Sequence, residues 1–135
     1  MTVSEIQKKS EPGIRRTIRP VQFDDIVPSD IGSEKSVDQL IRDLIEDEDE
    51  MVRSAAAGTL GIIKSDKSIE ALIRALQDRH VYVRHGAAWA LGEIKSEKAI
   101  EPLYRSALTD NDRITRGKAA EALWKIQKEK SRSPE

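Results

Sequence analysis

The chain has 135 residues and a formal net charge of −1, with 35% charged and 4% aromatic side chains. This length suits one domain, and the balanced charge provides no overall basic field for binding nucleic acid. Without cysteine the chain cannot form disulfides or thiolate metal sites. It also lacks a signal-peptide pattern and any apolar stretch approaching the roughly 20 residues that cross a bilayer, so we expect a cytoplasmic protein without a membrane span.

Residues 1–35 are expected to form a largely irregular N-terminal extension, because Pro12 and Pro28 interrupt any long helix. Residues 1–20 carry five basic and two acidic side chains and are predicted to be a flexible tail. The segment 21–35 is expected to dock on the first repeat, with partner binding as the alternative. Its apolar side chains are Val21, Phe23, Ile26, Val27 and Ile31.

From residue 36 onward the sequence repeats itself. Val52-Arg53 recurs thirty-one residues later as Val83-Arg84, and Arg84 recurs after a further thirty-two as Arg116. Many matches at nearly constant spacing are typical of a repeat architecture. We predict repeats at about 36–64, 65–95 and 96–128, followed by a polar tail at 129–135.

Each repeat is predicted to contain two helices. The first helix has apolar residues at helical spacing, which in the first copy are Val37, Leu40, Ile41 and Leu44. Pro102 is expected to bend the corresponding helix of the third copy. The second helix of each copy follows an acidic turn, which favours the positive end of a helix. The candidate N-caps of the first helices are Ser36, Ser65 and Ser96, and the second helices are expected near 50–64, 81–95 and 112–128.

The second helix of the middle repeat, residues 83–94, reads Val-Arg-His-Gly-Ala-Ala-Trp-Ala-Leu-Gly-Glu-Ile. It resembles the HEAT-like repeats of the phycobilisome-lyase type, whose pattern is close to acid-x-x-x-V-R-x-x-A-A-x-A-L-G-x-I. The resemblance covers about residues 36–128 and implies an all-α fold, a right-handed α-solenoid of three HEAT-like helix pairs. It also implies that the second helices line the concave face. The third copy departs from the pattern, with Thr115 in place of Val and Trp124 in place of Gly.

The same resemblance assigns structural roles to several residues. It implies that the repeated arginines, Arg53, Arg84 and Arg116, bond acidic residues of neighbouring turns. Gly61 and Gly92 are expected to stay small because the next repeat packs closely against them. Trp124 occupies the corresponding position in the last repeat, and we expect its side chain to fold over the exposed end as a cap.

The sequence offers little for catalysis, since a triad or a metal site needs convergent polar groups and the chain has two histidines. Deoxyhypusine hydroxylase, built from similar repeats, binds iron through His-Glu pairs after the Val-Arg positions. Here those positions hold Ser54-Ala55, His85-Gly86 and Gly117-Lys118, so that ligand set is missing and we expect no metal and no cofactor. A helical-repeat DNA glycosylase is disfavoured because the inner surface lacks the basic residues that phosphate contacts need.

One helix face carries large side chains that the core does not use. At 100° per residue, Tyr82, Trp89 and Glu93 point away from the predicted core, with His85 beside them. Their counterparts in the flanking repeats extend the surface, and Gly58 is expected to leave a recess next to Trp89. We predict an apolar row of Met51, Tyr82 and Ile114 and a charged rim of Glu93, Lys118, Glu121 and Lys125.

The sequence therefore predicts a non-catalytic protein–protein interaction module, a scaffold or adaptor, that binds another protein or peptide on the concave face. The predicted partner-binding residues are Met51, Tyr82, His85, Trp89, Glu93, Ile114, Lys118 and Glu121. Three alternatives remain open at this point. The patch could be covered by the N-terminal segment of the same chain or by a second copy in a homodimer, or the chain could be an accessory subunit or chaperone of a lyase-like enzyme.

Overall fold

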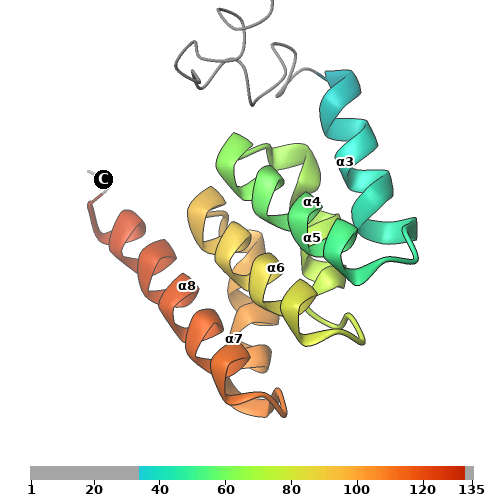
Figure 1. Ribbon diagram of the computed structural model, residues 1–135. Coiled ribbons are helices and arrows are strands. Elements are labelled where there is room, and N and C mark those ends of the chain that lie inside the picture. The colour runs from blue at the N-terminus through green and yellow to red at the C-terminus, as the bar shows by residue number, and fades with distance from the viewer. Residues whose placement is uncertain (1–33, 133–135) are drawn as a thin grey trace, which may run out of the picture.

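The computed structural model describes residues 34–132, and every regular element among them is helical (Figure 1). The predictions for residues 1–33 and 133–135 lie outside the described residues. Two short 3₁₀ turns, η1 (Asp66–Ser68) and η2 (Glu97–Ala99), precede the first helices of the second and third repeats. The α-helices are α3 (Glu34–Glu46), α4 (Glu50–Ile63), α5 (Ile69–Ala75), α6 (Val81–Ile94), α7 (Ile100–Thr109) and α8 (Arg113–Arg132).

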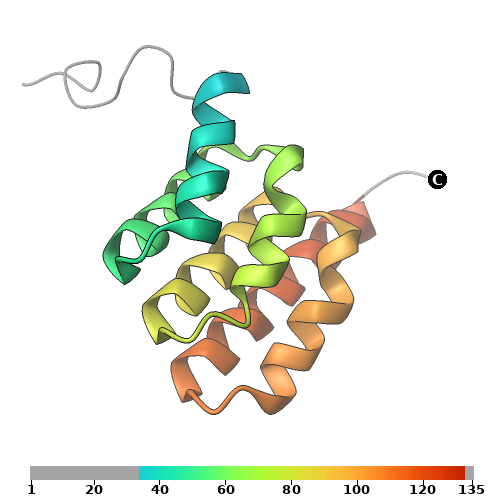
Figure 2. The same ribbon diagram turned by 90° about the vertical axis from the view of Figure 1, so that its right-hand side faces the viewer.

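The helices form two layers. The second helices α4, α6 and α8 lie side by side in one layer (Figure 1), and the first helices α3, α5 and α7 lie in the other (Figure 2). Consecutive helix pairs therefore stack in one direction, with α3 and α4 at one end and α7 and α8 at the other. This arrangement confirms the predicted all-α solenoid of three helix pairs.

The core lies between the two layers and along the seams within them. Alanine dominates the second helices, and Ala57, Ala87 and Ala88 are fully buried, which lets neighbouring helices approach closely. Leucines fill the space between the layers. Burial of each side chain of this size stabilises the fold by about 1.5–3 kcal/mol, because it removes apolar surface from water. The largest fully buried leucines are Leu60, Leu72, Leu76, Leu91 and Leu103.

The ends of the second helices use local chemistry. The Asp49 side chain accepts a hydrogen bond from the backbone N–H of Met51, and the His80 ring accepts one from Tyr82 in the same way. The C-caps Lys64 and Lys95 adopt the left-handed conformation, with φ of 60° and 61°. This conformation ends a helix, although glycine is the usual residue there.

Three local predictions need correction. Of the candidate N-caps, Ser36 lies inside α3, which begins at Glu34, and Ser65 makes no capping hydrogen bond with its side chain. Ser96 accepts the N–H of Lys98 at 3.2 Å and so caps the 3₁₀ turn η2, whereas the N-cap position of α7 is Ala99. Pro102 lies in the first turn of α7, where a backbone N–H has no helical partner, so a bend is not required. Helix α8 continues to Arg132 instead of ending near 128.

Candidate functional site

The turns that lead into the second helices are tied together by arginine. The Arg53 guanidinium donates to both carboxylate oxygens of Asp78 at 2.9 and 3.0 Å, and its Nη1 donates to the carbonyls of Asp47 and Glu48. Arg84 repeats the contact one repeat later, with Nε 3.0 Å from Asp110 Oδ2. The prediction that these arginines bond acidic residues of neighbouring turns is confirmed for both, and their role is structural.

The carboxylate of Asp78 is held in its charged form. Burial raises the pKa of Asp78. The hydrogen bonds from the Arg53 side chain and the His80 backbone together lower this pKa by more than burial raises it, so the pKa lies below its ordinary value. A bidentate pair between Arg53 and Asp78 is among the strongest polar contacts a protein makes. It orients the start of α6, on which Tyr82 and His85 stand.

A second polar contact fixes His85. Its Nε2 lies 2.7 Å from Asp112 Oδ2, and the same carboxylate oxygen accepts the backbone N–H and the hydroxyl of Thr115. These contacts, led by the one with His85, lower the pKa of Asp112 to about 2. The His85 ring also meets the Tyr82 ring edge to face, with centroids 5.9 Å apart. His85 is thus a positioned neighbour of Tyr82.

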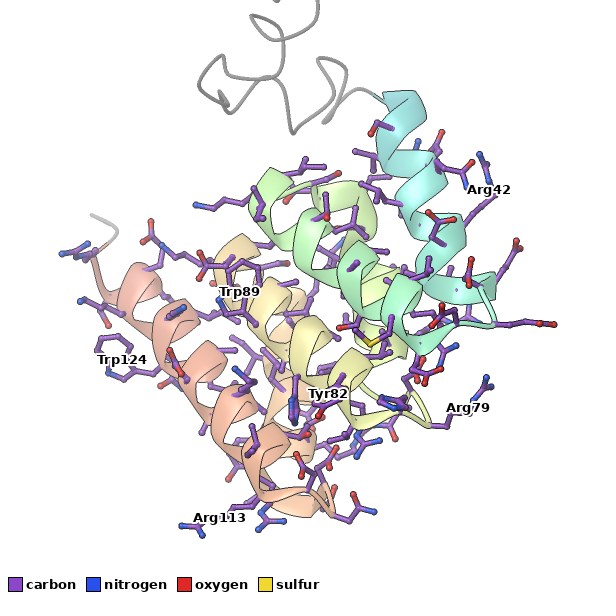
Figure 3. The ribbon with its side chains drawn as sticks, viewed as in Figure 1. Arg42, Arg79, Tyr82, Trp89, Arg113 and Trp124 are labelled. Atoms are coloured by element: carbon purple, nitrogen blue, oxygen red, sulfur yellow. The ribbon has the colours of Figure 1, made fainter. Side chains whose placement is uncertain are left out.

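The predicted apolar row exists as an exposed feature of the α4–α6–α8 layer. Met51, Tyr82 and Ile114 occupy the same place near the start of α4, α6 and α8, and they are 62%, 55% and 58% exposed. Figure 3 shows Tyr82 on the side of α6 that faces the viewer. Large apolar side chains that remain exposed to solvent on the second helices of all three repeats form a patch suited to contact with another molecule.

A shallow pocket of about 440 Å³ lies beside this row. It combines apolar side chains with one cation and two small residues that open the space between α4 and α6. The lining residues are Met51, Ser54, Tyr82, His85, Gly86, Trp89 and Lys118. Five of them were predicted as partner-binding residues. Ser54 and Gly86 were not, although their small size at adjacent positions of neighbouring helices is a signal that the sequence contains.

Trp89 lies differently from the expectation. Its ring packs against α4 at Gly61, because a Cβ atom added to Gly61 would lie 2.7 Å from Trp89 Cζ3. The space at Gly58 is open and does not hold the ring. Trp89 is half-buried against the core, so its side chain serves both the seam between α4 and α6 and the wall of the pocket (Figure 3).

The charged rim divides into paired and unpaired groups. Lys125 Nζ lies 2.7 Å from Glu93 and 3.9 Å from Glu121, and its hydrogen bond lowers the pKa of Glu93. Glu93 and Glu121 do not line the pocket beside the row. Among residues 34–132, no acidic side chain pairs with Lys118, which leaves this ammonium group as the cation available at the pocket.

Trp124 does not fold over the end of the stack. Its ring is exposed and directed away from the helices, with Lys128 Nζ 4.7 Å from the ring centroid (Figure 3). The cap interpretation is therefore wrong. By contrast, the expectation for the glycines is confirmed, since a Cβ at Gly61 or Gly92 would lie within 3 Å of Ala90 or Ala122 in the next second helix.

The described residues also limit what else the site can be. Within residues 34–132, no three His, Asp or Glu side chains converge on a position that could hold a metal ion. None of the described helices is long and apolar enough to cross a membrane.

Comparison with known proteins agrees with this architecture. The family model of HEAT repeats matches residues 37–124, which covers all three helix pairs. No curated protein matches the chain. Because the match covers more than half of the sequence, the chain belongs to the family of HEAT repeats.

Proposed function

We propose that this chain is a non-catalytic interaction module that binds another protein or peptide through the α4–α6–α8 layer, whose exposed side we take as the concave face. HEAT repeats are commonly protein-interaction modules. The observation that carries the proposal is the exposed row of Met51, Tyr82 and Ile114 beside the pocket. Aromatic and methionine side chains that can be desolvated together are typical anchors of protein interfaces.

The charges at the pocket suggest the chemistry of the partner. Lys118 has no acidic partner among the described residues, whereas Glu93 and Lys125 neutralise each other. A partner segment that places apolar side chains on the row and a carboxylate near Lys118 would match both features. Glu121 remains at the rim, where it would favour the orientation of a partner more than its affinity.

The polar groups at the pocket support binding over catalysis. His85 Nε2 is engaged by Asp112, and that carboxylate oxygen is already shared with Thr115. A carboxylate on one ring nitrogen still leaves the other for acid–base chemistry, but nucleophilic catalysis also needs a hydroxyl within reach of that nitrogen. The Ser54 hydroxyl at the same pocket donates to the Tyr82 carbonyl at 3.3 Å instead. The relation to the phycobilisome-lyase type and the cytoplasmic location remain predictions.

The test compares two tyrosines that are equally exposed on opposite layers. Tyr82 on α6 is 55% exposed and Tyr104 on α7 is 56% exposed. Immobilised full-length protein, Tyr82→Ala and Tyr104→Ala are incubated with lysate of the source cells, and retained proteins are identified by mass spectrometry. The captured partner is then titrated against each variant, and Tyr82→Ala should weaken binding by about thirtyfold, equivalent to roughly 2 kcal/mol.

Tyr104→Ala is the control and should bind like the unmodified chain. Lys118→Glu should lower the affinity and its dependence on salt, because it reverses the charge that faces the partner. If Tyr82→Ala retains the partner with full affinity, the α4–α6–α8 layer is not the binding surface. If the retained protein is the chain itself, the row is a homodimer interface instead.

A further inference from the structure

We propose that residues 15–31 of the same chain cover the open side of α4, at the N-terminal end of the helix stack. This side, called the α4 edge below, consists of Val52, Ala55, Thr59 and Ile62, which repeat at helical spacing. It faces away from α6 and is distinct from the pocket, so the inference is independent of the proposed function.

Burial of equivalent residues shows that the α4 edge is built as an interface. Val83 and Thr115 stand at the same place in α6 and α8 as Val52 does in α4, and both are fully buried. Val52 is 36% exposed. A valine suits a covered position, but among residues 34–132 there is no second helix of an earlier repeat to cover Val52.

The small residues of the edge lead to the same conclusion. In the later repeats, Ala90 and Ala122 are the residues that the preceding helix touches through Gly61 and Gly92. Thr59 is their counterpart in α4, and its hydroxyl is already satisfied by the carbonyl of Ala55 at 2.9 Å. The edge therefore presents no unmet hydrogen-bonding side chain at this position that would require water.

The end of the edge is apolar where later repeats are charged. Ile62 is exposed, whereas its counterparts are Glu93 and Lys125, which pair with each other. Val52 to Ile62 spans about 15 Å of helix at 1.5 Å per residue. An apolar strip of this length on the outside of a terminal repeat needs a cover, because capping repeats are normally polar on their outer face.

The charges at the two ends of the strip specify the direction of the cover. Asp47 is the counterpart of Asp78 and Asp110, each of which accepts an arginine from the preceding repeat. Among the described residues, no basic side chain lies within ion-pair distance of Asp47, whose carboxylate accepts the Asp49 N–H. The other end carries Lys64, so the cover should be acidic near Lys64 and basic near Asp47.

Residues 15–31 match this order. Helices α3 and α4 run antiparallel across a three-residue turn, so the start of α3 lies near the Lys64 end of α4 (Figure 2). Read backward from α3, the sequence presents Ile31 and Asp30, then an apolar stretch that is interrupted by Asp25 and Asp24, and then basic side chains. The apolar residues are Ile31, Val27, Ile26, Phe23 and Val21, and the basic residues are Arg19, Arg16 and Arg15. Ten extended residues reach at most about 33–36 Å, which is enough to follow the strip to Asp47.

A second copy of the chain fits the edge less well. Head-to-tail stacking would place helix α8 of another copy alongside α4, where a preceding second helix belongs, and Arg116 of that copy could then meet Asp47. The seams inside the molecule, however, require a glycine, since even a Cβ at Gly92 would lie 2.9 Å from the next helix. Trp124 stands at that position in α8, and its side chain would hold the two copies apart.

Because the chain has no cysteine, single introduced thiols test the cover in the full-length protein. Ala55→Cys places a thiol on the α4 edge, and Ala120→Cys places one at an exposed alanine of α8 at the other end of the stack. Reaction rates with a thiol reagent are compared in the presence and absence of Phe23→Asp and Ile26→Asp. The thiol of Ala55→Cys should react about tenfold more slowly than that of Ala120→Cys, as expected if the edge is covered in nine molecules of ten.

The aspartate substitutions should raise the rate of Ala55→Cys to that of Ala120→Cys and leave the latter unchanged. A charge reversal of Arg15, Arg16 and Arg19 to glutamate should raise it as well. Equal rates for the two thiols in the otherwise unmodified chain would overturn the proposal. Protection that grows with protein concentration would also overturn it, since that behaviour identifies a second copy as the cover.

Discussion

At the scale of single residues, a buried guanidinium links each repeat to the next. Arg53 is buried, with its N–H groups shared between the Asp78 carboxylate and two carbonyls of its own turn. A buried charge is tolerated only when its hydrogen bonds are complete. Arg116 has the same place in the last repeat, but its Nη1 donates to the Asp110 carbonyl and it has no carboxylate partner among the described residues. The two arginines therefore allow a controlled comparison.

Arg53→Ala should lower the free energy of unfolding by about 1.5–3 kcal/mol, because it leaves the half-buried Asp78 carboxylate without the charged donor that pairs with it. Arg116→Ala should cost about 1 kcal/mol, the value of an ordinary hydrogen bond. Urea unfolding followed by circular dichroism measures both. Equal losses for the two variants would contradict a special role for the pair between Arg53 and Asp78.

Asp112 makes the stability of the chain depend on acid pH. Its pKa is lowered from 3.8 to about 2 in the folded protein, so the charged form stabilises the fold above pH 4. That stabilisation is lost as the pH falls from about 4 to about 2, since the carboxylate is protonated over this window. The difference in stability between the unmodified chain and Asp112→Asn should therefore shrink in this range. A constant difference from pH 4 to pH 2 would show that the contact with His85 does not depend on the charge of Asp112.

At the scale of helices, glycine sets the distance between neighbours in the α4–α6–α8 layer. Gly61 and Gly92 each face an alanine of the next helix, and a Cβ atom added to either glycine would lie within 3 Å of that alanine. Close-packed seams of this kind transmit any added volume to the backbone. Gly117, in α8, has no atom near its Cβ position, so an identical substitution there meets open space.

Gly92→Ala should destabilise the protein by about 1–3 kcal/mol, because the added methyl group meets Ala122 at 2.9 Å and forces α6 and α8 apart. Gly117→Ala should stabilise it by roughly 0.5–1 kcal/mol, because alanine loses less conformational entropy in a helix. Thermal melts of the two variants measure the opposite shifts. A stabilised Gly92→Ala would show that the seam can open without cost.

At the scale of the whole molecule, the stack has two different ends and a continuous core. The α4 edge is apolar, whereas the opposite end carries the exposed Trp124 with Lys128 beside its ring. The core extends from Val37 in α3 to Ile126 in α8. Each repeat buries its apolar surface against its neighbours, so we expect the three repeats to unfold together in this short stack.

The two tryptophans report on cooperative unfolding in different repeats. In Trp124→Phe the fluorescence comes from Trp89 in the middle repeat, and in Trp89→Phe it comes from Trp124 in the last one. Each fluorescence transition should coincide with the transition of the same variant measured by far-ultraviolet circular dichroism. A fluorescence transition of Trp89→Phe at lower urea concentration than its circular dichroism transition would show that α8 unfolds separately.

Much of the architecture could be predicted from the sequence because its causes are local and repeated. The period of thirty-one to thirty-two residues places the three second helices, and the apolar spacing identifies their buried sides. The contacts of Arg53 and Arg84 and the need for glycine at 61 and 92 follow from the same repetition. A feature that recurs in several copies of one unit reports the geometry that all the copies share.

Only the tertiary structure decided the features that depend on distances between helices. Trp89 was expected beside Gly58 but packs on Gly61, because the offset between α4 and α6 brings its ring to the glycine nearer the end of α4. Trp124 points outward instead of capping the stack, and Ser54 and Gly86 join the pocket through their lack of bulk. A helical pattern specifies the direction of a side chain around its own axis, but the position of the neighbouring helix along that axis results from packing both surfaces together.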